Sequence, residues 1–355
     1  MFEQLLTIAR NTFTEAIRQP IFVVLVLLGL IAMVLNPAVV NYTLADDNKI
    51  LTDIGLSTIL LVSLFVAAFT ASGVLSSEIE SRTVLTVVSK PVARPIFVLG
   101  KYLGVAGAIA IAFLILSLMF VLTLRHGVIQ TVRDQFDQPV WLMGSLAVLG
   151  SFALAALGNY LFRWVFTSTL TLALAVSLTV ATGLVLLISP DWQVQSPLTE
   201  FTAHDGRLAQ ITLGLVLVLE AVMLLAGVAV AASTRLGQIM TLLVCLGVFA
   251  LGLSMESLSN LVDARLNLPG GVGLGESLAA VLAAEVPMGL KMVYTLAKLV
   301  YVIAPDLQFF WPADAISQGH PMTAGHLGTV TAYAGLYLGL LLCLAVSLFQ
   351  TREVG

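Results

Sequence analysis

The chain has 355 residues, of which 59% are hydrophobic and 10% are charged, and its net charge is −4. The small net charge and the lack of a basic run interleaved with aromatic residues argue against nucleic-acid binding. An ordinary soluble domain has about 25% charged residues, so much of this chain must face lipid instead of water. We therefore expect an all-α polytopic bundle of transmembrane helices.

The first 19 residues have the pattern of an amphipathic helix. Apolar side chains recur at helical spacing at Phe2, Leu5, Leu6, Ala9, Phe13 and Ile17, and polar ones fall largely on the other face. This pattern predicts a helix that lies in the cytoplasmic membrane interface, and it does not fit a cleavable signal. A simple flank of the first span is the alternative.

Residues 20–355 then form the transmembrane domain. A bilayer core about 30 Å thick needs roughly 20 apolar helical residues. Eight segments meet this need: Pro20 to Val40, Ile54 to Leu75, Leu103 to Leu124, Trp141 to Leu161, Val165 to Ser189, Ile211 to Ala232, Ile239 to Leu258 and His326 to Phe349. Only a short turn around Arg163 separates the fourth and fifth spans, so six spans with one broken pair is the alternative.

One region between the last two spans is too polar or too interrupted to cross. It covers residues 256–325, in which Met292 to Ile303 is apolar but short and is followed by prolines. We expect short surface or re-entrant helices there, on the outward side. Phe309, Phe310 and Trp311 are expected to anchor this region in the membrane interface.

Lysine and arginine set the orientation. With the N-terminus inside, the cytoplasmic segments carry five acidic residues and nine basic ones. The basic residues are Arg10, Arg18, Arg82, Lys90, Arg94, Lys101, Arg163, Arg235 and Arg352. The outward segments are net acidic. We therefore expect both termini in the cytoplasm and a multi-pass protein of a bacterial inner membrane.

The segment 76–101, SSEIESRTVLTVVSKPVARPIFVLGK, has features of a docking loop. It contains both acidic and basic residues. A first short helix is expected to end at Lys90-Pro91, and Pro95 is expected to set a second short piece. The order Glu-x-Glu-x-x-Thr, then Ser-x-Pro-Val-x-Arg, then Leu-Gly-Lys resembles the type-2 ATP-binding-cassette (ABC) permeases, including those that serve nitrous oxide reductase maturation. The matching residues are Glu78, Glu80, Thr83, Ser89, Pro91, Val92, Arg94, Gly100 and Lys101.

Other segments extend the resemblance. The opening LLTIARNTFTEAIRQPIF is similar to the family's elbow helix, AASTRLGQIMTLL to its late cytoplasmic turn, and SLFQTREV to its ending. Arg82 stands where the family usually has glycine. The family's common form has six spans, so eight spans imply an additional hairpin over Trp141 to Ser189.

The resemblance implies a permease subunit of an ABC exporter, which is a transport subunit and not an enzyme. In the family this segment is the coupling helix that enters a groove of a cytoplasmic ATPase. The implied coupling residues are Glu78, Glu80, Arg82, Thr83, Ser89, Pro91, Arg94 and Lys101. The sequence has no G-x-x-x-x-G-K-[ST] loop, so ATP must be bound by a separate subunit. A second permease copy or a similar permease is also implied.

Glu220 is the one carboxylate in the middle of a predicted span. An ionisable residue there costs about 2.5–3.5 kcal/mol or more and is a functional candidate by default, but a hydrogen-bonded structural role is the alternative. The outward histidines, His126, His204, His320 and His326, lack the spacing of a metal site. A non-transporting membrane anchor and an intramembrane enzyme are the remaining alternatives to a permease.

Overall fold

The computed structural model describes residues 1–40, 47–80, 93–128, 136–202, 207–265, 287–317 and 322–350, together with positions 279 and 283. Within these ranges the chain is helical, and the only strand-like pairing is an isolated bridge between Ile188 and Val194. The expected all-α polytopic bundle is confirmed.

Long helices dominate the described chain. In order they are α1 (Phe2–Arg18), α2 (Pro20–Val40), α3 (Asp47–Glu80), α5 (Arg94–His126), α6 (Gln138–Phe162), α7 (Phe166–Leu187), α8 (Pro197–Thr202), α9 (Arg207–Ser233), α10 (Gln238–Arg265), α12 (Met288–Ile303), the 3-10 turn η2 (Gln308–Phe310), α13 (Ala313–Ser317) and α14 (Ala324–Gln350).

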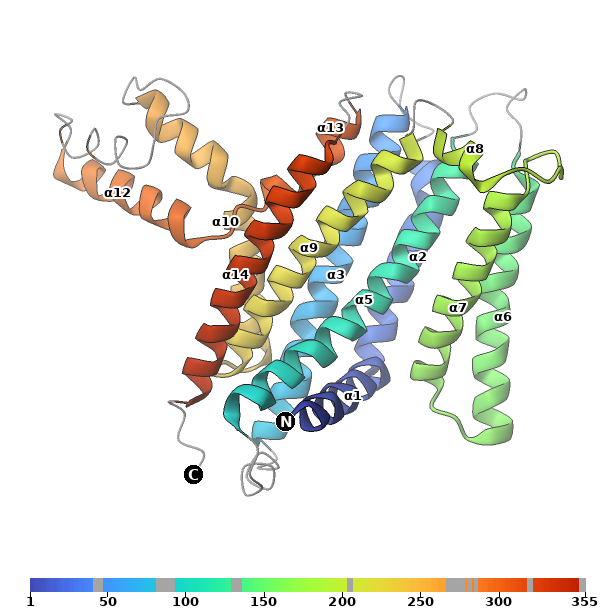
Figure 1. The fold of residues 1–355 in the computed structure, drawn as a ribbon, viewed down its shortest axis with the longest axis horizontal. Coiled ribbons are helices and arrows are strands. Elements are labelled where there is room, and N and C mark those ends of the chain that lie inside the picture. Colours follow the sequence, from blue (N-terminus) through green and yellow to red (C-terminus); the bar gives the residue numbers. More distant parts are fainter. Residues whose placement is uncertain are drawn as a thin grey trace.

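Seven of the described helices are long and apolar enough to cross a bilayer: α2, α3, α5, α6, α7, α9 and α14. In α10 the described apolar stretch is Gln238–Ser254, which is slightly shorter. Figure 1 shows that α10 leads from the end of the bundle where α9 finishes toward the opposite end. The expected eighth span lies within α10, and that it crosses the membrane stays a prediction. The chain is a multi-pass membrane protein.

The predicted hairpin exists as two complete helices. α6 has 25 residues and α7 has 22. The chain reverses between them at Arg163, which has a left-handed backbone with φ of 56° and ends α6. Because each helix is long enough to span by itself, the six-span alternative does not describe this fold.

The bundle has two distinct ends, which we call the α1 end and the α8 end. α1 lies across one end, and the N-terminus and the last turn of α14 are both found there (Figure 1). α8 and α13 lie at the other end. An even number of crossings therefore separates the two termini, as expected. That the α1 end faces the cytoplasm stays a prediction.

The bundle centre is formed by α3, α5 and α9. α9 packs against α3, α10 and α14, and α5 packs against α1, α2, α3 and α7. In α9, 72% of the most apolar stretch is buried within the protein, whereas in α14 the share is 17%. α14 is therefore a peripheral helix of the bundle, and most of its surface is not covered by the described part of this chain.

A pair of backbone carbonyls in α10 marks where this helix leaves the bundle. Leu307 donates its N–H to the carbonyl of Gly252 at 3.2 Å, and the side chain of Gln308 donates to the carbonyl of Leu253 at 2.7 Å. In Figure 1 the later part of α10 and α12 lean away from the other helices. α12 has 16 residues, so a short helix does form in this region. That it lies on the outward side stays a prediction.

The aromatic anchors of this region require a correction. Phe309 is half exposed, in agreement with an interfacial position. Phe310 is only 1% exposed and belongs to the hydrophobic core of the bundle. Trp311 is half-buried against the same core. Phe310 therefore fastens η2 to the helices and is not an interfacial anchor.

Candidate functional site at the α1 end

α1 is seated on α5 over two glycines. A side-chain carbon at Gly104 would lie 2.5 Å from the carbonyl oxygen of Ala9, and one at Gly100 would lie 2.8 Å from a methyl group of Ile8. Only glycine permits this close approach of two helices. The beginning of α5, which closes the segment 76–101, is therefore fixed directly beneath the amphipathic helix.

Lys101 lies in this α1–α5 contact. It is 3% exposed, and its Nζ lies 4.0 Å from a carboxylate oxygen of Glu15 and 5.7 Å from the centre of the Phe97 ring. A buried ammonium group is costly unless an opposite charge is near. Lys101 therefore joins α5 to α1, and its charge is directed into the protein.

The last carbonyls of α14 are bound by two arginines from other parts of the chain. Arg94 Nη1 donates to the carbonyl of Gln350 at 2.5 Å, and Arg235 Nε donates to the carbonyl of Leu348 at 2.9 Å. The final carbonyls of a helix have no partner within it and carry its negative dipole end. Two guanidinium groups therefore complete and neutralise the end of α14.

The side chains of only two of the eight predicted coupling residues, Arg94 and Lys101, are described. Glu78 and Glu80 lie by their backbone in the last turn of α3, and α3 ends at the α1 end of the bundle (Figure 1). Nothing is described of their side chains, and four further residues lie outside the described ranges: Arg82, Thr83, Ser89 and Pro91. Arg94 and Lys101 are described, and both contact other helices of the same chain.

The polar face of α1 borders a shallow hollow of about 720 Å³. The hollow is lined by Arg10, Asn11, Thr14, Glu15, Arg18, Gln19 and Pro20. The α1 end thus combines a polar, hollowed surface with the two attachment points of segment 81–92. A protein or a charged lipid surface fits such a face better than an apolar partner does.

Glu220 lies between α9 and α14. The hydroxyl of Thr331 donates to Glu220 Oε1 at 2.6 Å, while Oε2 is buried without a hydrogen-bond partner among the described residues. One oxygen therefore links two spans, as the structural interpretation expects. The second oxygen leaves capacity for one more donor.

The histidines and cysteines do not gather into a site in the described part of the chain. His126 accepts a hydrogen bond from the indole of Trp141 at 3.2 Å, and His326 is exposed. His204 and His320 lie outside the described residues. Cys245 and Cys343 are free thiols. Where side chains are described, no three His, Cys, Asp or Glu residues come together as a metal site requires.

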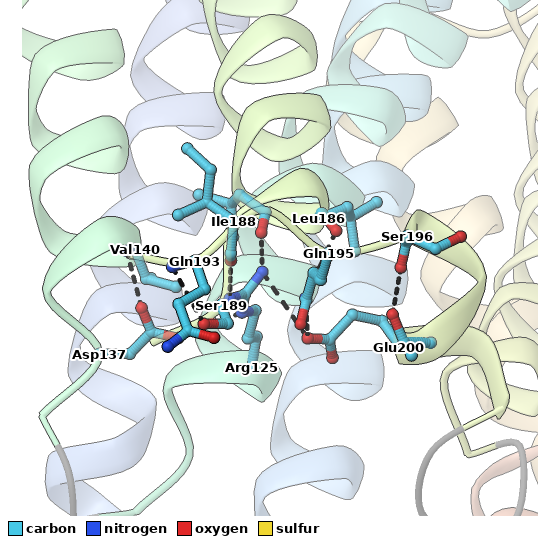
Figure 2. A network of polar contacts seen from close by, with 12 residues as sticks. Arg125, Asp137, Val140, Leu186, Ile188, Ser189, Gln193, Gln195, Ser196 and Glu200 are labelled. Carbon is cyan, nitrogen blue, oxygen red and sulfur yellow. Dashed lines mark hydrogen bonds and ion pairs between the residues drawn. The ribbon is translucent and has the colours of Figure 1, made fainter. Parts of the chain in front are cut away.

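The sequence alone did not predict a network of buried charges at the α8 end. Arg125, from the last turn of α5, donates to Asp137 at 3.1 Å and to the backbone carbonyls of Val185 and Ile188, and lies 3.8 Å from Glu200 (Figure 2). Its side chain is 7% exposed and that of Asp137 is 4% exposed.

This network fastens the α6–α7 hairpin to the bundle. Asp137 accepts from the N–H of Val140 and thereby caps the start of α6, while Arg125 binds carbonyls at the end of α7. Gln195 holds Glu200 at 2.7 Å. In the sequence, an arginine stands directly after a span, with an acidic residue twelve positions later. The network could not be predicted from this pair, because it forms only when four separate segments of the chain come together.

Comparison of the sequence with protein-family models and with curated proteins finds no match. The account of function therefore rests on the residues and on their arrangement.

Proposed function

We propose that this chain is the membrane-spanning permease subunit of an ABC exporter, and that segment 76–101 is the docking site of a separate cytoplasmic ATPase. The observation that carries the proposal is the attachment of the segment. α3 leads into it, and α5, which leaves it, is bonded to α1 and α14 in its first two turns.

This attachment gives a mechanical reason for the position of a coupling segment. A push on residues 81–92 acts on α3 and α5, which lie at the bundle centre. The contacts of Arg94, Phe97 and Lys101 carry the same push to α14 and α1. Closing of an ATPase pair can in this way tilt several spans together and change which face of the membrane has access to the substrate.

The proposal includes three partners. ATP is bound by the cytoplasmic ATPase, a second permease copy or a similar permease completes the transporter, and the bilayer surrounds both. It also places the α1 end in the cytoplasm of a bacterial cell and the α8 end outside. The excess of basic residues in segments at the α1 end supports this orientation.

The position of Arg94 determines how docking should be tested. Because Arg94 binds the end of α14, reversing its charge would disturb the fold as well as the docking surface. The Glu80→Arg/Arg82→Glu pair keeps the net charge and lies within the proposed docking segment. Tagged wild type and this variant are purified in mild detergent from the native host, and the bound proteins and ATPase activity are recorded. Asp191→Arg, an exposed change at the α8 end, is the control.

Wild type and the control are expected to bring down a protein with a phosphate-binding loop, and the paired variant is expected to lose it. If an ATPase binds all three proteins equally, docking occurs elsewhere. If none of the preparations carries an ATPase, the anchor or enzyme interpretation replaces the permease.

A further inference from the structure

A cavity of about 710 Å³ lies between α3, α10 and the segment that contains η2 and α13. Its volume is within the usual range for sites that bind small molecules. We call it the α3–α10–η2 cavity. Its lining combines three aromatic rings with three polar side chains: Phe249, Phe309, Trp311, Ser57, Gln308 and Asp314. It is therefore not a purely apolar space between helices.

The wall formed by η2 is held in place by the rest of the fold. The side chain of Gln308 donates to the carbonyl of Leu253 in α10 at 2.7 Å. Phe310, the next residue but one, is 1% exposed and packs in the core of the bundle. The cavity is therefore formed before any ligand arrives, and a ligand does not have to order this wall when it binds.

The lining changes from polar to apolar along the length of the cavity. Asp314 belongs to α13, which lies at the α8 end of the bundle (Figure 1). α3 runs from the α8 end toward the α1 end, so Ser57 is nearer the α8 end and Leu61 lies one turn deeper. α10 runs the other way, so Phe249 lies one turn deeper than Leu253. The cavity therefore suits a ligand with a polar group at one end and an apolar body at the other.

The described charges near the polar end are mostly negative. Asp314 lines the cavity and is exposed. Asp53, in the second turn of α3, lies close enough to interact electrostatically with both Asp314 and Lys49. A further carboxylate, that of Asp306, accepts a hydrogen bond from the N–H of Gln308 at 3.0 Å. Three carboxylates thus accompany one lysine in this part of the described chain, and such a field attracts a cation and repels an anion.

The kind of cation follows from the other side chains. Among the described residues, no three carboxylates, histidines or cysteines are close enough together to hold a metal ion. The cavity offers aromatic rings instead. Phe309 is half exposed, and Trp311 is half-buried. A cation is attracted to the face of an aromatic ring, and this attraction is commonly used to recognise organic ammonium groups. An organic cation therefore fits the lining better than a metal ion.

We propose that the α3–α10–η2 cavity binds a monovalent organic cation that has an aromatic or alkyl body. Its cationic group lies beside Asp314 and against the rings of Phe309 and Trp311, on the side of the α8 end. Its apolar body extends past Leu61 toward Phe249. A zwitterionic phospholipid fits less well, because its phosphate would meet the carboxylates. This inference does not depend on the proposed transport function, since binding needs neither an ATPase nor a second permease.

The cavity is tested with two ions of nearly the same shape and opposite charge, tetraphenylphosphonium and tetraphenylborate. The full-length protein is placed in phosphatidylcholine nanodiscs, the equilibrium binding of each radiolabelled ion is measured, and binding to empty nanodiscs is subtracted. Asp314→Asn removes the charge and keeps the size, and Asp191→Asn, at another exposed aspartate of the α8 end, is its control. Phe309→Leu removes one ring of the cavity, and Phe162→Leu, at an exposed ring outside the cavity, is its control.

Wild type is expected to bind tetraphenylphosphonium at one saturable site per chain and to show no saturable binding of tetraphenylborate. Asp314→Asn is expected to weaken the binding of the cation about tenfold, because it removes an attractive charge. Phe309→Leu is expected to weaken it about threefold, because it removes one ring face. The two control variants should bind as wild type does, and added salt should weaken the binding in all proteins that keep Asp314.

Three results would overturn the proposal. One is the absence of saturable tetraphenylphosphonium binding to wild type above the level of empty nanodiscs. Another is saturable binding of tetraphenylborate with equal affinity, which would make the cavity a site for apolar bodies of either charge. The third is unchanged affinity for the cation in Asp314→Asn. If Asp314→Asn does not fold, the comparison of Phe309→Leu with Phe162→Leu decides in its place, and equal affinity of these two variants contradicts the proposal.

Discussion

The ring of Phe97 in the first turn of α5 stacks on that of Phe349 in the last turn of α14, with centroids 5.4 Å apart and planes 22° from parallel. Three residues earlier, Arg94 binds the carbonyl of Gln350. One turn later, Lys101 meets Glu15 of α1. The beginning of α5 thus holds the first helix and the last helix of the chain at the same place.

The two arginines at the end of α14 predict a local effect on stability. Arg94→Ala and Arg235→Ala each remove a donor from carbonyls that have no helical partner. A cation at a helix C-terminus contributes about 1 kcal/mol, so amide exchange in the last two turns of α14 is expected to accelerate about fivefold. Hydrogen exchange by mass spectrometry measures it. Arg163→Ala, an exposed arginine, should leave α14 unchanged, and an equal effect of that control would contradict the account.

The seat of α1 on α5 predicts that Gly104 cannot be enlarged. In Gly104→Leu the new side chain collides with the backbone of Ala9, so α1 is expected to lift from α5. Overpacking of this kind costs about 1–3 kcal/mol. The readout is maleimide labelling of Thr12→Cys, a buried position on α1, in a background without Cys245 and Cys343.

In the parent protein, position 12 should stay protected. Gly107→Ala is the control, because a carbon there would lie 3.4 Å from the flexible ring of Phe13. Unchanged protection in Gly104→Leu would show that α1 is not held by this contact.

Two variants and a double-mutant cycle distinguish a structural role of Glu220 from a role in proton or substrate handling. Glu220→Gln keeps an oxygen for the Thr331 hydroxyl, whereas Thr331→Val removes the donor. If the residue links α9 and α14, Glu220→Gln should retain stability and transport. The Glu220→Leu/Thr331→Val cycle should give a coupling of about 0.6–1.7 kcal/mol. Thr329→Val on α14 is the control. Loss of transport in Glu220→Gln at unchanged stability would instead assign Glu220 to proton or substrate handling.

The buried network at the α8 end predicts a large effect at Arg125. Arg125→Met leaves Asp137 buried without its partner, and breaking a buried pair costs about 3–5 kcal/mol. Arg125→Lys keeps the charge but loses the fork that binds the carbonyls of Val185 and Ile188, so it should also loosen the hairpin. Thermal unfolding and proteolysis between α7 and α9 measure the effects of Arg125→Met and Arg125→Lys. Arg163→Lys should behave as wild type. A mild effect of Arg125→Met would contradict the role of the buried network in fastening the hairpin.

The sequence predicted the helices well and their contacts poorly, for physical reasons. A span must be apolar along about 20 residues, and that property is local, so seven of the expected spans appear as long apolar helices and the eighth within α10. The amphipathic period of α1 is local as well. The burial of Phe310 depends on how η2 returns to the bundle, and nothing in its neighbouring residues reveals that.

The candidate site was predicted only in part for a similar reason. The segment 76–101 was found by its residue pattern, and its ends do meet the α1 end of the bundle. Arg94 was expected to serve docking, yet its partner is Gln350, 256 positions later in the chain. A pairing across that distance becomes visible only when the last helix has been placed beside α5.

The most direct test of the docking proposal is photocrosslinking from the segment itself. p-Benzoylphenylalanine is placed at Val87 and, as a control, at Val194, which is 89% exposed at the α8 end. Irradiation in native cells is followed by identification of the crosslinked proteins. The account predicts that Val87 crosslinks to an ATPase that carries a phosphate-binding loop and that Val194 does not. A protein without such a loop at Val87, or the ATPase at Val194, would contradict it.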